Sequence, residues 1–323
     1  MCTAISFKTR DHYFGRNLDL EYHYNESVIV TPRNYPLSFR CKDTLDTHYA
    51  IIGMAIAEDD YPLYYDATNE YGLSIAGLNF PENAFYYPVD DAKDNITPFE
   101  LIPWLLGQCK NLSEARNLLD NINIVNISFS NKFPLSPLHW IVCDKDNAIV
   151  VEQTKAGIFI YDNPVGVLTN NPPFPYHQYN LQNYMNVTAK EPKNFFSEHL
   201  SLSPYSRGMG GIGLPGDLSS ASRFVRATFT KENSLCNDDE LSSISQFFHI
   251  LNSVAQQRGC AQVGDGYEIT YYTSCCNTDA GIYYYTTYEN AQITAVRMTN
   301  TNLEGNSLSI FPLVTTQQIH FEN

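Results

Sequence analysis

Runs of β-branched and aromatic residues recur along the chain and predict strands. These runs lie near residues 3–7, 27–31, 50–57, 73–79, 138–143, 147–152, 157–161, 269–273, 282–288 and 293–298. The predicted strands are concentrated towards the two ends of the chain.

Apolar residues at helical spacing predict three helices between the strands. Thr97-Pro98-Phe99-Glu100 resembles a capping box with proline at the first helical position, and Pro103 is expected to kink the helix that follows. A second helix is expected to begin at Ser113 and a third to cover residues 242–258 and stop at Gly259.

The order of these elements predicts one domain over residues 1–323. No Pro- or Ser-rich linker divides the chain, and no repeat is visible. Strand hairpins surround the helical segments and do not alternate with them one by one, which favours an α+β fold with helices packed on antiparallel sheets.

Composition and charge exclude several classes of partner. The chain has 323 residues, of which 43% are hydrophobic, and a formal net charge of -15. Without a basic stripe, a nucleic-acid partner is not expected. No apolar run approaches the ~20 residues that span a bilayer, and the first residues lack the layout of a secretory signal. We therefore expect a cytoplasmic protein with no membrane partner.

Cysteines and histidines show no metal or redox pattern. The eight cysteines lack C-x-x-C spacing and are expected to be free thiols, which disfavours a thiol redox protein. No histidine pair has ligand spacing, and His139 in a predicted strand is interpreted as a core residue with satisfied hydrogen bonds. GMGGIG at 208–213 is interpreted as a loop because no helix follows it, and no G-x-S-x-G elbow is present.

Cys2 is the residue with the most distinctive chemistry. A small residue after the initiator methionine predicts removal of Met1, which gives one residue both a thiol and a free α-amine. The two groups titrate near ~8.5 and ~8, so they can act as nucleophile and base around neutral pH. An N-terminal amine can activate its own side chain without a histidine.

Such a nucleophile needs an oxyanion hole and groups that orient the amine. The candidates are Arg16, Asp19, Asn79, Asn170 and Arg223. Each also has a structural interpretation: strand-end ion pairs for Arg16 and Asp19, turns for the two asparagines, and a helix start for Arg223. Strict alternation places Arg16 and Asp19 on opposite faces, so the strand is expected to break near Asn17 if both serve one site.

Several long motifs occur in the order expected of the choloylglycine hydrolase family. They include MCTAISF, YFGRNLDL, GLSIAGLNFP, VLTNNPPF and GIGLPGDLSSASRFVRA. The chain resembles this family over essentially its whole length, and it is most similar to the bile salt hydrolases, with penicillin V acylases as the nearest relatives.

The resemblance implies an N-terminal-nucleophile hydrolase with a four-layer α-β-β-α sandwich of two antiparallel sheets. It implies that Cys2 is nucleophile and base, that Arg16 keeps the thiol reactive, and that Asp19 anchors the amine. Asn79 would form part of the oxyanion hole, and Asn170 would orient the amine and the tetrahedral intermediate. Arg223 would complete the charged residues around Cys2. Asparagine at position 79 favours the bile-salt type over the penicillin type, in which tyrosine is expected.

The substrate implied by the resemblance is a glycine- or taurine-conjugated bile salt, cleaved without a metal or organic cofactor by a homotetramer. Apolar residues that could hold the steroid are Leu18, Leu20, Tyr61, Phe129, Phe133 and Leu135, although each could equally belong to the core. The alternatives are a penicillin V or N-acyl homoserine lactone acylase and, more distantly, a non-catalytic binder that never exposes the Cys2 amine.

Overall fold

The computed structural model describes residues 1–323 and contains two large antiparallel sheets. The six-stranded sheet has the order β12-β1-β2-β15-β16-β17, formed by β1 (Cys2–Lys8), β2 (His12–Leu20), β12 (Val167–Leu168), β15 (Ile269–Asn277), β16 (Ile282–Thr287) and β17 (Asn290–Arg297). The eight-stranded sheet has the order β11-β10-β9-β6-β5-β4-β3-β18, formed by β3 (Ser27–Thr31), β4 (Ile51–Glu58), β5 (Tyr61–Asn69), β6 (Ser74–Asn79), β9 (Leu138–Cys143), β10 (Ala148–Thr154), β11 (Gly157–Asp162) and β18 (Ser309–Pro312).

The remaining elements are helices and short strand pairs. The α-helices are α1 (Leu101–Gln108), α2 (Leu112–Leu119), α3 (Phe174–Asn180), α4 (Ser220–Asn233) and α5 (Glu240–Asn252). The 3-10 helices are η1 (Leu181–Tyr184), η2 (Met209–Gly211) and η3 (Met298–Asn300). The two-stranded pairs are β7 (Asp94–Ile96) with β8 (Ile122–Ile124) and β13 (Gln262–Val263) with β14 (Gly266–Tyr267).

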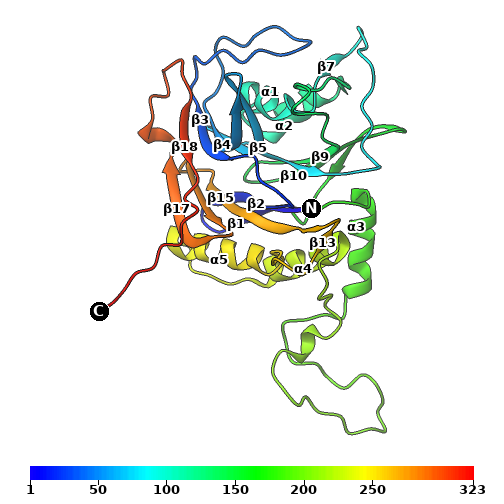
Figure 1. Cartoon of the computed structure of the whole chain (residues 1–323). Coiled ribbons are helices and arrows are strands. Elements are labelled where there is room, and N and C mark those ends of the chain that lie inside the picture. Colours follow the sequence, from blue (N-terminus) through cyan, green and yellow to red (C-terminus); the bar gives the residue numbers. More distant parts are fainter.

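The elements stack in four layers, α-β-β-α, which confirms the expected fold class. In Figure 1, α1 and α2 cover the outer face of the eight-stranded sheet, and α4 and α5 cover the outer face of the six-stranded sheet. The two sheets face each other, so most of their strands are buried on both faces. This is why the strands read as nearly continuous apolar runs.

Helix α5 illustrates how the sequence pattern sets the packing. Ile244, Phe247, Phe248 and Leu251 follow the i, i+3, i+4, i+7 spacing and are all buried against the six-stranded sheet. The helix begins after Asp239, whose carboxylate accepts a hydrogen bond from the backbone N–H of Ser242 at 2.9 Å.

Several predicted boundaries were wrong. Helix α1 begins at Leu101, and Pro103 lies in its first turn, where a missing N–H removes no intrahelical bond, so no kink is required. The third predicted helix, α5, ends at Asn252, well before Gly259. Strand β5 and helices α3 and α4 were missing from the expected elements, as were the short strands β7, β8, β12, β13, β14 and β18.

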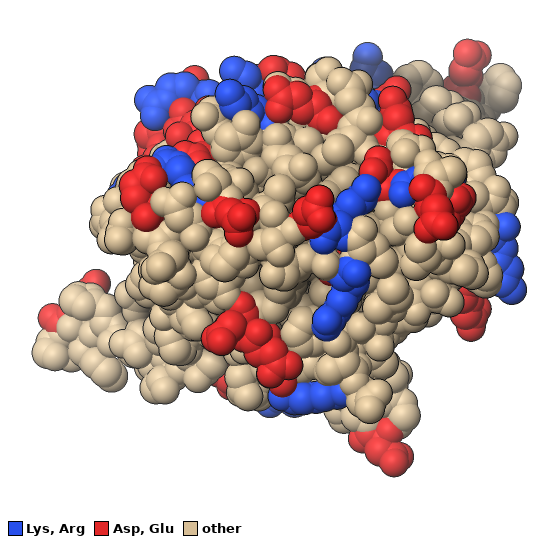
Figure 2. Space-filling view, turned by 90° about the horizontal axis from the view of Figure 1, so that it is seen from above, with Lys and Arg blue, Asp and Glu red and all other residues tan.

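The surface carries charges of both signs. On the face above α1 and α2, Lys and Arg side chains are interspersed with Asp and Glu (Figure 2). No helix has both the length and the apolar composition needed to cross a membrane. A long segment between η1 and α4 extends away from the layered body (Figure 1).

Candidate active site

Cys2 begins β1 and is buried, with 2% of its surface exposed. The antiparallel pairing of β1 with β2 sets Cys2 opposite Leu18 and Ala4 opposite Arg16. Since side chains alternate across a strand, Cys2, Arg16 and Leu18 share the face directed at the eight-stranded sheet, and Asp19 lies on the face directed at α4 and α5.

Strand β2 is unbroken from His12 to Leu20, which corrects the expectation of a break near Asn17. Arg16 and Asp19 do lie on opposite faces of the strand. Both can approach Cys2 because this residue begins the strand. Cys2 lines the pocket together with Arg16, and its backbone contacts Asn170 and Arg223, which lie on the side of Asp19.

The side chain of Arg16 extends from β2 to the eight-stranded sheet, where its guanidinium lies between two strands. Its guanidinium donates to the carbonyl of Gly77 on β6 at 2.5 Å and to that of Tyr65 on β5 at 3.2 Å. Burial alone would lower the pKa of Arg16, but its acidic neighbours, Cys2 first among them, raise it overall. A buried cation is therefore fixed on the thiol side of β2.

Arg223 supplies a second buried cation from the opposite side. This residue on α4 donates to the carbonyl of Cys2 at 2.5 Å, to the hydroxyl of Thr3 at 2.6 Å and to Oδ1 of Asn170 at 2.8 Å. Burial lowers the pKa of Arg223, and the carboxylate of Asp19, 3.9 Å away, opposes this shift.

Asn170 connects the backbone of Cys2 with Asn79. Its Oδ1 accepts from the backbone nitrogen of Cys2 at 2.7 Å, and its Nδ2 donates to the carbonyl of Asn79 at 2.7 Å. Asn79 lines the same pocket as Cys2. The five other candidate catalytic residues therefore all lie around Cys2.

Met1 precedes Cys2 in the structure, so the nitrogen of Cys2 is a peptide N–H here. The α-ammonium of Met1 contacts the buried carboxylate of Glu268 and donates to the carbonyl of Asp19 at 2.6 Å. Burial lowers the pKa of this ammonium.

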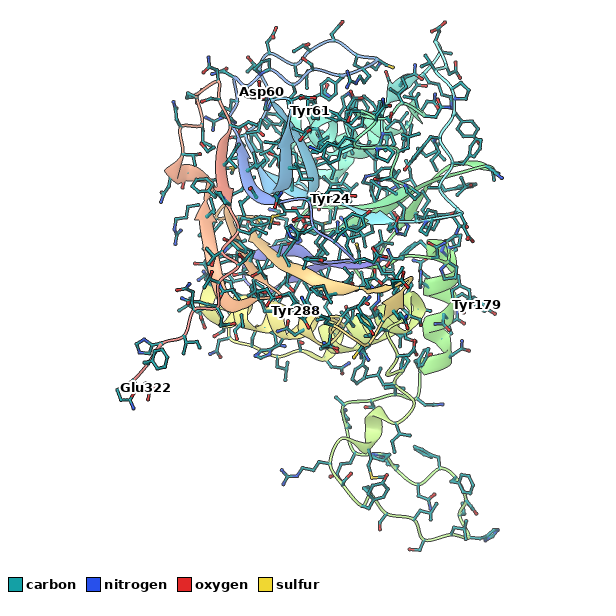
Figure 3. All side chains as sticks on the ribbon, in the orientation of Figure 1. Tyr24, Asp60, Tyr61, Tyr179, Tyr288 and Glu322 are labelled. Atoms are coloured by element: carbon teal, nitrogen blue, oxygen red, sulfur yellow. The ribbon has the colours of Figure 1, made fainter.

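An apolar pocket of about 400 Å³ opens on the thiol side of Cys2. Five of the six candidate substrate-binding residues lie on its wall: Leu18, Leu20, Phe129, Phe133 and Leu135. Tyr61 does not; it is buried behind the wall, with its ring centroid 5.9 Å from that of Phe129. Tyr24 also lines the pocket and lies between the levels of the two sheets in Figure 3.

The pocket exists because β5 and β6 separate. The two strands pair only where Asp66, Ala67 and Thr68 face Ala76, Ile75 and Ser74. Beyond this point Tyr65 and Gly77 diverge, and Arg16 bridges their carbonyls. Residues from the helical side of the sheet, Phe99, Ile102 and Trp140, therefore line the same pocket as Cys2.

Sequence reasoning missed a buried carboxylate behind Arg16. Asp66 accepts from the hydroxyls of Tyr272 at 2.7 Å, Tyr283 at 2.6 Å and Ser274 at 3.1 Å. Burial raises the pKa of Asp66, while the charge of Arg16 and these hydroxyl donors oppose the shift. The signal in the sequence that could have pointed to Asp66 is a single charged residue in the tyrosine-rich segment that forms β5.

His139 is the satisfied core residue that its position predicted. One ring nitrogen lies 3.0 Å from Glu152 and the other 2.9 Å from the carbonyl of Thr169, and the side chain is fully buried.

The glycine-rich segment at 208–213 was interpreted as a loop. It contains only the short 3-10 helix η2, which agrees with that interpretation.

A four-layer α-β-β-α sandwich whose first strand begins with a cysteine has the N-terminal-nucleophile hydrolase fold. The sequence profile described as "Linear amide C-N hydrolases, choloylglycine hydrolase family" matches residues 2–311. The chain belongs to the choloylglycine hydrolase family and is a hydrolase of linear amide C–N bonds.

Named relatives cover the whole chain. A bile salt hydrolase/transferase of Lactiplantibacillus plantarum is 56% identical over 100% of both chains, and one of Clostridium perfringens is 41% identical over 100% of both. The crystal structure of the C2A mutant of conjugated bile acid hydrolase from Clostridium perfringens superposes with a TM-score of 0.93 at 40% identity, covering 100% of both chains. Penicillin V acylase from Agrobacterium tumefaciens, at 18% identity and a TM-score of 0.75, shares the fold over 96% of this chain and 90% of its own.

Proposed function

We propose that this hydrolase cleaves the amide bond between a bile acid and glycine or taurine, with Cys2 as nucleophile. The observation that carries the proposal is the apolar pocket that ends at the thiol of Cys2. Its volume lies in the range of small-molecule sites, and its wall is mostly apolar with few polar groups. The names of the full-length relatives support the same substrate class.

Removal of Met1 is the activating step. It turns the nitrogen of Cys2 into an α-amine, which Oδ1 of Asn170 at 2.7 Å would orient. Removal also withdraws the Met1 ammonium from the vicinity of Glu268 and Asp19. Asp19 then anchors the new amine from the helical side of β2.

The chemistry uses two nucleophilic steps. The amine takes the proton of the thiol, and the sulfur attacks the amide carbonyl to form a tetrahedral oxyanion, which Asn79 and Asn170 stabilise. The C–N bond breaks as the ammonium returns the proton to the leaving nitrogen of glycine or taurine. Water, deprotonated by the amine, then attacks the thioester carbonyl. The C–S bond breaks as the ammonium returns the proton to the sulfur, which gives the free bile acid and the thiol.

Steroid burial would supply most of the affinity. At about 25 cal/mol per Å² of apolar surface, covering a few hundred Å² of a fused ring system gains several kcal/mol. Leu18, Leu20 and Phe129 would contact the rings, and the polar glycine or taurine would project outward.

The test combines intact mass, alkylation and turnover. We expect loss of Met1, single labelling at Cys2 by a limiting thiol alkylator, and parallel loss of taurocholate and glycocholate cleavage. Turnover of penicillin V or an N-acyl homoserine lactone without turnover of either bile salt would instead assign the acylase alternative. Retained Met1 with no turnover of any amide would support the non-catalytic binder.

We also propose that residues 1–323 form one domain and that the chain assembles as a homotetramer. The segment between η1 and α4 exposes Phe195, Phe196 and Tyr205, each more than 80% accessible, and a second copy could bury them. Sedimentation velocity should give a tetramer, and Phe195→Ser with Phe196→Ser should lower the sedimentation coefficient. A monomer for the unmodified chain would refute the assembly without affecting the catalytic proposal.

A further inference from the structure

Two residues outside the expected catalytic set hold the carboxylate of Asp19. The hydroxyl of Thr270 on β15 donates to Oδ1 at 2.6 Å, and Nε2 of Gln256, after α5, lies 3.5 Å from Oδ2. Asp19 is fully buried and Thr270 and Gln256 are nearly so. A buried carboxylate depends on such donors because water cannot replace them.

A β-bulge puts Thr270 in this position. Pairing of β15 with β2 is regular from Asn277 to Tyr272, which stands opposite Leu18. The register then shifts, so that Thr270 stands opposite Asp19 and Tyr271 has no partner in the ladder. If the register of Tyr272–Asn277 continued without this shift, Tyr271 would stand opposite Asp19 and its ring would replace the small hydroxyl.

The orientation of the Thr270 hydroxyl is also fixed. The backbone N–H of Gln256 donates to Oγ1 of Thr270 at 2.7 Å, and the backbone N–H of Thr270 donates to the carbonyl of Gln256 at 3.1 Å. Because a donor already occupies one side of Oγ1, its own proton is directed to Asp19. The bond is charge-assisted and short, as expected for a hydroxyl on a carboxylate.

We propose that Thr270 is a positioning residue that holds Asp19 in the orientation needed to anchor the α-amine of Cys2, with Gln256 in support. The inference rests on the proposed role of Asp19 in the amidase. Arg223, 3.9 Å from the same carboxylate, donates its hydrogen bonds to other groups, so Thr270 provides the shortest contact that fixes the Asp19 side chain. Thr270 and Gln256 also line a second pocket together with Tyr288. Figure 3 shows Tyr288 at the level of α5, below Tyr24, which lines the apolar pocket.

The experiment compares Thr270→Val, which removes the hydroxyl with little change in shape, with Thr270→Ser, which keeps it. Thr273→Val is the matched control, because Thr273 is buried on the same strand and donates to Asn17 at 2.8 Å without contacting Asp19. We expect Thr270→Val to lower kcat on taurocholate roughly tenfold to a hundredfold with KM changed less than about twofold, the loss typical of a hydrogen bond to a charged group. Thr270→Ser should restore kcat to within about threefold of the unmodified enzyme, and Thr273→Val should leave kcat unchanged.

Alkylation of the Cys2 thiol provides a readout that needs no substrate. The rate of labelling at Cys2, followed on the N-terminal peptide, should fall in Thr270→Val and recover in Thr270→Ser. Equal kcat and labelling rates in Thr270→Val and the unmodified chain, or an equal loss in Thr273→Val, would overturn the proposal. If Thr270→Val does not fold, Thr270→Ala is judged by the same criteria.

Failure of the proposed function looks different. If the unmodified chain cleaves no bile salt, the substrate assignment is wrong, and the labelling comparison still decides whether Thr270 acts on Cys2.

Discussion

Two buried arginines approach Cys2 from opposite faces of the six-stranded sheet. Arg16 lies on the pocket side and Arg223 on the helical side, and each is anchored to backbone carbonyls. Two buried cations with fixed hydrogen-bond partners therefore flank Cys2, one on each side of the sheet. The site is thus organised around the sulfur before any substrate binds.

Replacing Cys2 by serine should abolish most of the activity. An alcohol is a much weaker nucleophile than a thiol with an accessible thiolate, so we expect turnover of taurocholate to fall by roughly a hundredfold or more. Intact mass should still show removal of Met1, because serine is also small. Cys260→Ser, at an exposed cysteine, serves as the control and should retain full turnover. Comparable rates for the two variants would exclude Cys2 as nucleophile.

Asp19→Asn should reduce both turnover and stability. The substitution keeps the size of the side chain but removes the negative charge 3.9 Å from Arg223, which is fully buried. Loss of one partner of a buried pair typically costs ~3 kcal/mol in the free energy of unfolding. Urea unfolding measures this cost and taurocholate turnover the effect on catalysis. Unchanged stability would show that Arg223 does not depend on this carboxylate.

At the level of elements, the sequence predicted most strands, the α+β class and the set of polar residues around Cys2. These features follow from local patterns: apolar runs, spacing within a helix, and motifs in a fixed order. The separation of β5 from β6 and the bulge in β15 were not predictable, because both depend on which strands pair and where the pairing stops. Asp66 and Thr270 acquire their roles only through this pairing.

A substitution at Gly77, where β6 has separated from β5, tests whether the pocket between these strands is needed for substrate binding. A Cβ at this position would lie 3.1 Å from Nε1 and 3.3 Å from Cδ1 of Trp140, so Gly77→Ala should displace the indole, which lines the pocket together with Gly77. We expect kcat/KM for taurocholate to fall by roughly tenfold, mostly through KM. Gly211→Ala, where a Cβ meets nothing within 4 Å, is the control. Equal kinetics for both variants would mean that the indole can move away without narrowing the pocket.

For the whole molecule, the net charge of -15 opposes the approach of an anionic substrate. Affinity for a conjugated bile salt must therefore come from burial and not from long-range attraction. Raising the ionic strength from about 10 mM to about 300 mM screens this repulsion, so we expect kcat/KM for taurocholate, kept below its aggregation concentration, to rise. A steep fall in kcat/KM with salt would instead indicate local electrostatic steering towards the site.

Stability against acid should depend on two buried histidines. The ring nitrogens of His12 form hydrogen bonds with the hydroxyls of Ser6 and Thr278, both at 2.9 Å. Nε2 of His177 lies 2.9 Å from the carbonyl oxygen of Asn170. Burial lowers the pKa of each histidine from 6.5 to about 4. Between these two values the unfolded chain binds the protons and the folded chain does not, so stability must fall as the pH decreases through this range.

Between pH 7 and pH 4, each histidine should lower the free energy of unfolding by roughly 3 kcal/mol. The loss should begin near pH 6.5, before most carboxylates titrate. Urea unfolding at a series of pH values measures it. Changing His12 to Gln should lower the stability at pH 7 but flatten its dependence on pH between 6.5 and 4.5. His199→Gln, at an exposed position, should leave the slope unchanged. If the slope in His12→Gln equals that of the unmodified chain, His12 takes up its proton equally in the folded and unfolded states, and the acid sensitivity has another origin.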